Sequence, residues 1–255
     1  MTFDAAAAIG DRDRCITLEG AFNLRDIGGY QNVDGSRVRW RRVLRADAPE
    51  RLTFADRARL AALSIGTVID LRNSGEGGPG AWPISSAGRR FSLPLFDIVP
   101  EEGPLPRVID ALDLATRYLY RLETASQQLN TAVTLIAERD DAPALFHCAA
   151  GKDRTGILAA ALLQMLGVPD STIVDDYALS DTGHRRKIEA VSAAPLPFDA
   201  DYSTFPEILK GAEGQVMAEF LRLTAAKHGS VATFLTTCGL PASVPERLRT
   251  YLLER

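Results

Sequence analysis

The sequence predicts an α/β domain in which a central, mostly parallel sheet is flanked by helices, followed by a helical C-terminal part. Short apolar runs bounded by turn residues are typical of buried strands. Three such runs lie at 67–71, 91–95 and 144–147. Helical patterns separate these runs, and strands that alternate with helices favour parallel pairing within one sheet. From about residue 170 onward the pattern is almost entirely helical, with breaks at Pro195 and Pro197.

The other expected elements complete this alternation. Residues 23–48 combine glycine turns with β-rich stretches around Val38–Leu44, which predicts a small hairpin region. Thr53 is the expected N-cap of a helix over 54–63. We expect a loop rich in Gly, Ser and Pro at 74–90 and a long helix over about 109–138. A shorter helix is expected over 157–166 and ends before Gly167.

Composition is that of an ordinary globular protein. Of the 255 residues, 46% are hydrophobic and 24% are charged, which permits a sizeable core. The net charge of −4 does not favour nucleic acid, so an anionic substrate needs a local positive site. We expect no membrane span, because no apolar stretch reaches the roughly 18 residues that one requires.

The three cysteines indicate a reducing compartment. Cys15, Cys148 and Cys238 are too widely spaced for a disulfide framework or a Cys-x-x-Cys metal site. The N-terminus carries an early acid and lacks the long apolar run of a signal peptide. A cytoplasmic location is therefore expected, with secretion by a non-classical route left open.

The segment from His147 to Gly156, HCAAGKDRTG, carries the clearest chemical signal. It joins a predicted strand to a predicted helix, and ligands bind at such junctions in α/β sheets. Small residues at Ala149, Ala150 and Gly151 permit a tight curl, so that backbone N–H groups converge on an anion. The positive end of the following helix points at the same place. The loop is thus expected to bind phosphate with its backbone, from Ala149 through Arg154.

Two side chains in this loop point to catalysis. Cys148 stands at its start, where convergent N–H dipoles and a helix N-terminus favour the thiolate, which makes it the expected nucleophile. Arg154 stands at the helix end, and its planar fork can hold two phosphoryl oxygens. A P-loop kinase is excluded because Lys152 is followed by Asp153 rather than Ser or Thr. Positive charge from the loop and Arg154 makes a metal or other cofactor unnecessary.

Cys-x5-Arg between strand and helix, preceded by His, resembles the signature loop of protein tyrosine phosphatases. The fuller string resembles the bacterial and fungal tyrosine phosphatases that also dephosphorylate phosphoinositides. Further likenesses follow in the same order as in that family, and together they cover about 20–255. They are Asn23-Leu24-Arg25-Asp26 with Gly28-Gly29, Asp70-Leu71-Arg72, and Asp175-Asp176-Tyr177 with the helices after it.

The resemblance implies roles for the loop's other side chains. His147 would order the loop and support the thiolate, and Thr155, besides capping the helix, would stabilise the departing thiolate. Lys152 would add positive charge for a polyanionic substrate. Asp153 is our preferred general acid and base. The segment Trp82-Pro83-Ile84 has Ile where the better-known tyrosine phosphatases carry an acid, and Asp97 is the alternative acid.

Arg25, Asp26 and Arg72 are expected to form a structural ion-pair set beneath the site, with substrate contact as the alternative. The expected domain organisation is a leader over 1–20 and a single phosphatase domain over 21–255, with a helical lid or cap at about 180–228. The expected function is hydrolysis of phosphomonoesters by a cysteine-dependent enzyme of the protein-tyrosine-phosphatase class. Its partners would be phosphotyrosine, phosphoserine or phosphothreonine proteins, or phosphoinositides. The alternative is a phosphate-recognition module with weak or no catalysis.

Overall fold

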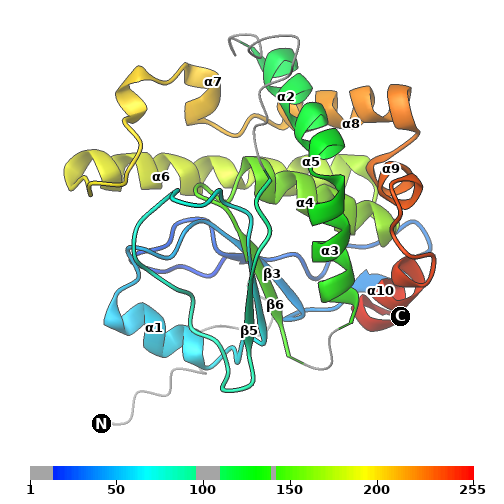
Figure 1. Ribbon diagram of the computed structural model, residues 1–255, viewed down its shortest axis with the longest axis horizontal. Helices are drawn as coiled ribbons and strands as arrows, with labels where there is room; N and C mark the ends of the chain where they lie inside the picture. The colour runs from blue at the N-terminus through cyan, green and yellow to red at the C-terminus, as the bar shows by residue number, and fades with distance from the viewer. Residues whose placement is uncertain (1–13, 96–109, 139–141) are drawn as a thin grey trace.

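The computed structural model describes residues 14–95, 110–138 and 142–255. Figure 1 shows a central sheet with helix α1 on its left, helices α3, α4 and α10 on its right, and helix α6 lying across its upper end. The predicted α/β class and mostly parallel sheet are confirmed. The helical C-terminal part covers one end and one side of this sheet.

The main sheet has five strands in the order β1-β3-β6-β4-β5. Strand β1 pairs antiparallel with β3, and the other three pairings are parallel. The central strand β6 is buried along its whole length, which matches its apolar sequence. A second, two-stranded sheet pairs β2 with β7. The strands are β1 (Arg25–Asp26), β2 (Arg37–Val38), β3 (Val43–Ala46), β4 (Thr67–Asp70), β5 (Arg89–Ser92), β6 (Ala144–His147) and β7 (Leu253–Glu254).

The helices account for most of the chain after residue 110. The helices are α1 (Phe54–Ala61), α2 (Ala111–Thr124), α3 (Ser126–Ala137), α4 (Asp153–Met165), α5 (Asp170–Ala178), α6 (Ser180–Ala193), α7 (Glu207–Lys210), α8 (Gly214–His228), α9 (Val231–Thr237) and α10 (Ser243–Leu252), with the short 3-10 helix η1 (Tyr202–Thr204) between α6 and α7. Helix α4 is buried along nearly all its length, because it lies between the sheet and the other helices.

Alternation of side chains along the strands divides the core into two parts. On one face, Val43, Ile69 and Phe146 belong to a large cluster shared with helices α2–α5 and α8–α10. On the other face, Leu44, Leu145 and their neighbours form a smaller cluster with α1. The parallel strands are therefore covered on both sides, and their carboxyl ends point toward α6.

The N-terminal boundary differs from the expected leader over 1–20. Ile16 and Leu18 are buried in the smaller cluster. The N–H groups of Glu19 and Gly20 donate to Asp56, the third residue of α1, at 2.9 and 2.8 Å. The same carboxylate forms a capping box with Thr53, so the predicted N-cap is confirmed. This part of the chain therefore packs on the domain.

Two element predictions need correction. The single helix expected over 109–138 is two helices, because the backbone leaves helical angles at Ala125, with φ −112° and ψ 25°. The bend lets α2 pack against α8 while α3 packs against α10. The strand expected at 91–95 is β5, which begins and ends earlier. The hairpin expected within 23–48 is present around 29–38, and Arg41, at φ 59°, then turns the chain between β2 and β3.

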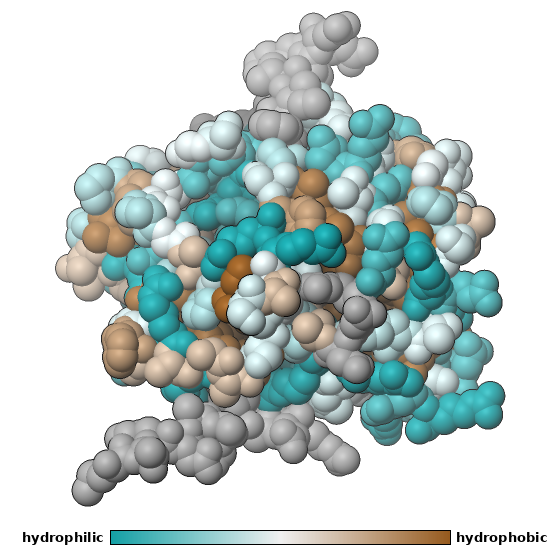
Figure 2. Space-filling view, turned by 60° about the horizontal axis from the view of Figure 1, so that its bottom comes forward, coloured by the Kyte–Doolittle hydropathy of each residue, from teal (hydrophilic) through white to brown (hydrophobic). Residues whose placement is uncertain are grey.

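The surface that Figure 2 presents is mainly hydrophilic, with small apolar groups between polar ones. Among the described residues, the exposed large hydrophobic side chains are Val33, Phe54, Leu112 and Leu179. No helix within the described ranges is both long and apolar enough to span a bilayer.

Candidate active site

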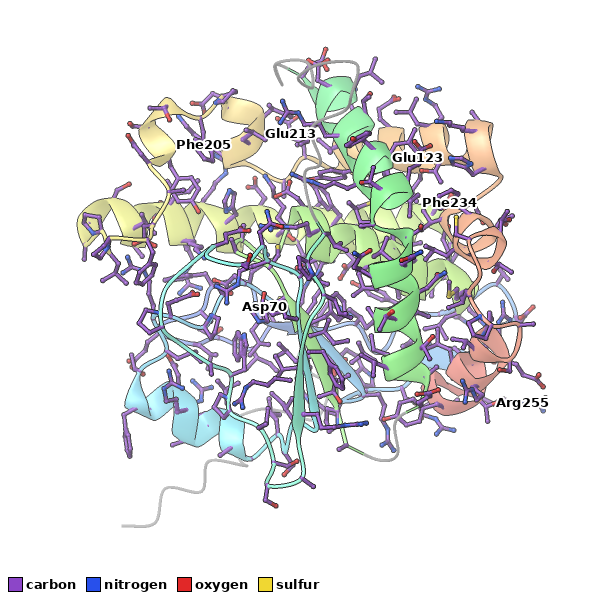
Figure 3. All side chains as sticks on the ribbon, in the orientation of Figure 1. Asp70, Glu123, Phe205, Glu213, Phe234 and Arg255 are labelled. Atoms are coloured by element: carbon purple, nitrogen blue, oxygen red, sulfur yellow. The ribbon has the colours of Figure 1, made fainter. Side chains whose placement is uncertain are left out.

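The loop singled out from the sequence begins where the central strand ends. His147 is the last residue of β6, and its partners in register are Ala46 at the end of β3 and Asp70 at the end of β4. The carboxyl ends of these parallel strands therefore meet at one edge, from which the loop runs into α4. Figure 3 labels Asp70 at this edge, below α6, and Phe205 in the segment above α6.

The tight curl of the loop depends on Gly151. Its φ is +66°, a region that residues with a Cβ rarely adopt. A Cβ at this position would also lie only 2.5 Å from the carbonyl oxygen of Ala46. Both observations require glycine, so the loop passes directly over the end of β3.

Donors from outside the loop hold the carbonyl groups of three successive loop residues. The contacts join Ala149 to Lys187 Nζ (2.5 Å) and the Ala48 N–H (3.1 Å), Ala150 to Asn23 Nδ2 (3.0 Å), and Gly151 to Asn23 Nδ2 and Arg45 Nη2 (3.0 Å each). The shape of the loop is thus fixed by side chains that come from β3, from the chain before β1 and from α6.

Cys148 and His147 are both buried at the base of the loop, at 1% and 2% exposure. His147 Nδ1 lies 3.3 Å from the Cys148 carbonyl oxygen, and its Nε2 lies 3.7 Å from an Asp70 carboxylate oxygen. Burial outweighs the attraction of Asp70 and lowers the pKa of His147 to about 4. A neutral imidazole in this place suits the ordering role implied for it.

Arg154 lies in the first turn of α4 and is paired with Glu76. Its Nη1 donates to Glu76 Oε2 at 2.6 Å, and its Nη2 donates to the other carboxylate oxygen at 2.5 Å. Burial opposes the charge, but the hydrogen bonds to Glu76 and the electrostatic interactions with Cys148 and Glu76 hold the pKa of Arg154 above its usual range. Glu76 comes from the loop after β4, and its contact fixes the plane of the guanidinium over the signature loop.

Asp153 is the N-terminal residue of α4 and accepts a hydrogen bond from the Tyr118 hydroxyl. Tyr118 also contacts the hydroxyl of Tyr177 at 2.8 Å. Burial by itself would raise the pKa of Asp153. The charges of Lys152 and Arg121 and the Tyr118 hydrogen bond outweigh burial and lower the pKa to about 2. The free protein therefore carries Asp153 as a carboxylate across the physiological pH range.

Lys152 has a different position from the one expected. Its ammonium group donates to the carbonyl oxygens of Leu209 and Gly211, each at 2.9 Å, and lies 3.7 Å from Asp153 Oδ1. Lys152 is only 1% exposed. The ammonium group therefore connects the loop to the end of α7. Other atoms of Lys152 line the cavity described below.

Thr155 is not the helix cap. Helix α4 begins at Asp153 and has Lys152 as its N-cap, so Thr155 lies inside the first turn. Its hydroxyl is buried, with no hydrogen-bond partner among the described residues. This leaves the oxygen available for the thiolate-stabilising role that the resemblance implies.

Arg25, Asp26 and Arg72 do not form a single ion-pair set. Arg25 pairs with Asp176 through its Nε at 3.2 Å. Asp26 accepts the N–H groups of Gly28 and Arg41, each at 2.7 Å, and organises the hairpin. Arg72 pairs with Asp70 and Glu50. Each of the three is paired within the protein, and Arg25 lies with the charges beneath the loop.

A cavity of about 330 Å³ opens over the signature loop. Helix α2 and the stretch between α6 and α7 form its other walls. It is lined by Glu76, Leu114, Arg117, Arg121, Ala149, Ala150, Lys152, Asp153, Arg154, His184, Ala200, Tyr202, Phe205 and Leu209. Asp97, the alternative acid, lies outside the described residues. Within the described ranges, no group of three or more His, Cys, Asp or Glu side chains is arranged to hold a metal ion.

Sequence reasoning missed several residues that support the site. Asp176 was noted only as part of a motif, yet it accepts from Arg25, Arg45 and the Tyr30 hydroxyl. Burial would raise its pKa, but the two arginines hold it well below the usual range. Burial also lowers the pKa of Arg45 to about 10. No local signal marks Arg45, Glu76 or Tyr118, and Lys187 shows only as part of a basic run over 184–187 that is typical of an exposed helix face. Tertiary contacts alone bring these four residues to the loop.

The chain belongs to the Tyrosine phosphatase family, whose model matches residues 16–254. It is 30% identical over 216 residues to a tyrosine-protein phosphatase of Nostoc commune, covering 79% of this chain and 71% of that protein. It is 28% identical over 278 residues to the triple specificity protein phosphatase PtpB of Mycobacterium tuberculosis, covering 92% and 98%. These relatives support phosphatase activity.

Among solved structures, the chain is similar to TpbA of P. aeruginosa in complex with pTyr. That likeness has a TM-score of 0.32 and 18% identity, and it covers 66% of this chain and 80% of that one. At this level it adds nothing to what the family match establishes.

Proposed function

We propose that this chain hydrolyses phosphomonoesters through a phosphocysteine intermediate formed on Cys148. The observation that carries the proposal is the position of this buried cysteine at the start of a loop that lines a cavity with several basic walls. Backbone N–H groups, the start of α4 and Arg154 all favour negative charge at this place. The same features stabilise the thiolate before attack and the equatorial phosphoryl oxygens during it.

In the first step, the Cys148 thiolate attacks phosphorus in line with the leaving oxygen. The sulfur–phosphorus bond forms as the bond between phosphorus and the leaving oxygen breaks, and the leaving oxygen takes a proton from the Asp153 carboxyl group. In the second step, Asp153 removes a proton from water, which attacks phosphorus and releases the thiolate. The buried Thr155 hydroxyl is free to stabilise that departing thiolate.

The low pKa of Asp153 determines where the first proton comes from. With a pKa of about 2, the free protein holds no proton on this carboxylate at neutral pH. A phosphate ester loses its second proton at about pH 6, so its monoanion can bring the proton into the cavity. Repulsion between a bound dianion and the carboxylate then favours placing that proton on Asp153. Protons balance without any other donor.

Three substrate classes fit this chemistry: phosphotyrosine proteins, phosphoserine or phosphothreonine proteins, and phosphoinositides. The printed name of the mycobacterial relative, a triple specificity phosphatase, is in keeping with this range. Arg117 and Arg121 add positive charge to the cavity wall that α2 forms, which suits polyanionic substrates. A cytoplasmic location remains the prediction made from the sequence.

The test of the proposal is turnover of nitrophenyl phosphate in the presence of a chelator, followed by a panel of phosphopeptides and phosphoinositides. Metal-independent turnover is the expected result. A protein that binds inorganic phosphate or tungstate but never releases product would instead be the phosphate-recognition module considered from the sequence. Loss of turnover on chelation would indicate a metal enzyme.

A further inference from the structure

The contacts that hold the three loop carbonyl groups also set the direction of the N–H groups that follow them in the chain. A peptide unit is planar and trans, so its C=O and N–H groups point in opposite directions. Donors behind the loop hold the carbonyl groups of Ala149, Ala150 and Gly151. The next N–H groups along the chain are thereby turned toward the cavity that Ala149 and Ala150 line. These N–H groups are the donors that a bound phosphoryl group needs.

Lys187 differs from the other carbonyl-holding side chains in its origin. Asn23 and Arg45 belong to the sheet side of the site, whereas Lys187 comes from α6, which lies across the end of the sheet (Figure 1). Its Nζ is 2.5 Å from the Ala149 oxygen and 4.0 Å from an Asp47 carboxylate oxygen. Lys187 is 9% exposed and Asp47 is 1% exposed.

The burial of this lysine shows that its contacts are specific. Lysine is almost never fully buried unless its charge is paired. Asp47 supplies that pairing and also accepts the N–H groups of Phe22 and Asn23, each at 3.0 Å to Oδ1. One buried carboxylate therefore fixes both Lys187 and the backbone of Asn23, so the two side chains that hold neighbouring loop carbonyls share an anchor.

We propose that Lys187 is a positioning residue that sets the orientation of the Ala149–Ala150 peptide and so directs the Ala150 N–H toward the phosphoryl group. The inference rests on the proposed phosphatase function and adds a residue of α6 to its machinery. The Ala48 N–H also donates to the Ala149 oxygen, at 3.1 Å, so loss of Lys187 weakens this orientation without abolishing it.

The test is Lys187→Met, which keeps the length of the side chain but removes its donor. Calorimetry measures tungstate affinity, and initial rates measure kcat/KM for nitrophenyl phosphate and for an alkyl phosphate. Removing an oxyanion donor costs about 100–1,000-fold in turnover, so a partly misdirected one should cost about tenfold in each quantity. The aryl and alkyl esters should lose the same factor, because the donor acts on the phosphoryl group and not on the leaving group.

The matched control is Lys227→Met on α8, where the lysine pairs with Glu123 and its side chain is 57% exposed. This variant should keep wild-type tungstate affinity and rates. If Lys187→Met lowers thermal stability but keeps wild-type tungstate affinity and wild-type rates, Lys187 is merely structural and the inference is wrong. If Lys187→Met does not fold, Lys187→Leu, which also lacks a donor, replaces it under the same criteria.

The tungstate measurement also separates this inference from the proposed function. A wild-type protein that binds tungstate without turning over substrate contradicts the proposed function, while the affinity of the Lys187 variant still decides the positioning role. A wild-type protein that does not bind tungstate contradicts both, because the loop is then not an anion site.

Discussion

The two sides of the cavity are built differently. On the sheet side, Asn23, Arg25, Arg45 and Asp176 form a buried network beneath the loop, each at 5% exposure or less. On the opposite side, which we call the cap side, the chain between α6 and α7 (194–206) consists of short turns and the 3-10 helix η1, and it carries Phe205 (Figure 3). The side chain of Phe205 is only partly buried. Hydrogen bonds from Lys152 and Lys187 join the two sides.

This difference separates two tasks. Chemistry on phosphorus requires donors fixed within fractions of an ångström, and a buried network of ion pairs and hydrogen bonds supplies that fixity. Substrate selection requires a surface that can vary, and loops over a rigid scaffold provide it. We therefore expect substitutions on the sheet side to affect stability and the chemical steps, and substitutions on the cap side to affect substrate preference.

The largest effect is expected for Asp153→Asn, on the chemical side of the division. General acid catalysis contributes about 10²–10⁴-fold, so kcat/KM for an alkyl phosphate should fall by that factor. It should fall much less for nitrophenyl phosphate, whose leaving group needs little protonation. Initial rates with the two esters measure the difference. Asp97→Asn is the comparison variant, and the opposite pattern between the two variants would transfer the acid role to Asp97.

The pH dependence should identify the source of the proton. Because the pKa of Asp153 lies near 2 in the free protein, the carboxylate is unprotonated throughout the assay range. We expect kcat/KM for an alkyl phosphate to fall about tenfold per pH unit above the second pKa of the ester, near 6. With a fluoroalkyl phosphate, whose second pKa is lower, the descending limb should move to lower pH. A limb that is identical for both esters would place the proton on the enzyme instead.

Asp176→Asn tests the sheet side through stability. The substitution leaves Arg25 and Arg45 buried without their shared carboxylate, and breaking a buried ion pair in this way costs about 3–5 kcal/mol. Urea unfolding measures the loss. Glu219→Gln on α8 is the control, because its pair with Arg222 lies at the surface, with side chains 28% and 60% exposed, and should contribute no more than about 1 kcal/mol. Equal stability of the two variants would refute the buried network as the support of the loop.

The smallest effect on the chemistry is expected for Phe205→Ala on the cap side. Phe205 lines the cavity and packs edge-on against Tyr202, with ring centroids 5.2 Å apart. An apolar contact of this kind is worth about 1–3 kcal/mol in substrate discrimination. We expect the ratio of kcat/KM between phosphopeptides and phosphoinositides to change, while kcat for nitrophenyl phosphate stays close to that of the wild type. A collapse of kcat for the small ester would show that the cap takes part in the chemical step.

The features that could be predicted from the sequence are those that depend on residues adjacent in the chain. The apolar run before His147 predicted the central strand, and the spacing of Cys148 and Arg154 predicted the loop between this strand and α4, because strand, turn and helix start are adjacent in the chain. The sequence did not predict the break at Ala125, which has neither proline nor glycine beside it and serves the packing of α2 against α8.

Several side chains that support the loop could not be predicted, because they are distant in sequence and of ordinary type. Glu76 lies in a loop that reads only as Gly-, Ser- and Pro-rich, yet it pairs with Arg154. Lys187 reads as part of a basic helix face, yet it is buried against Asp47. Lys152 was expected to serve the substrate because of its place in the motif, and only its tertiary contacts reveal the tie to Leu209.

The most direct test of the mechanism is to trap the phosphocysteine in Asp153→Asn. With nitrophenyl phosphate this variant should still form the intermediate but hydrolyse it slowly, since the second step lacks its base. Rapid acid quenching followed by peptide mass spectrometry should find one phosphoryl group on the peptide that contains Cys148, and none after Cys148→Ser is added. A burst of nitrophenol with no phosphoryl group on Cys148, or with one on another residue, would contradict the account.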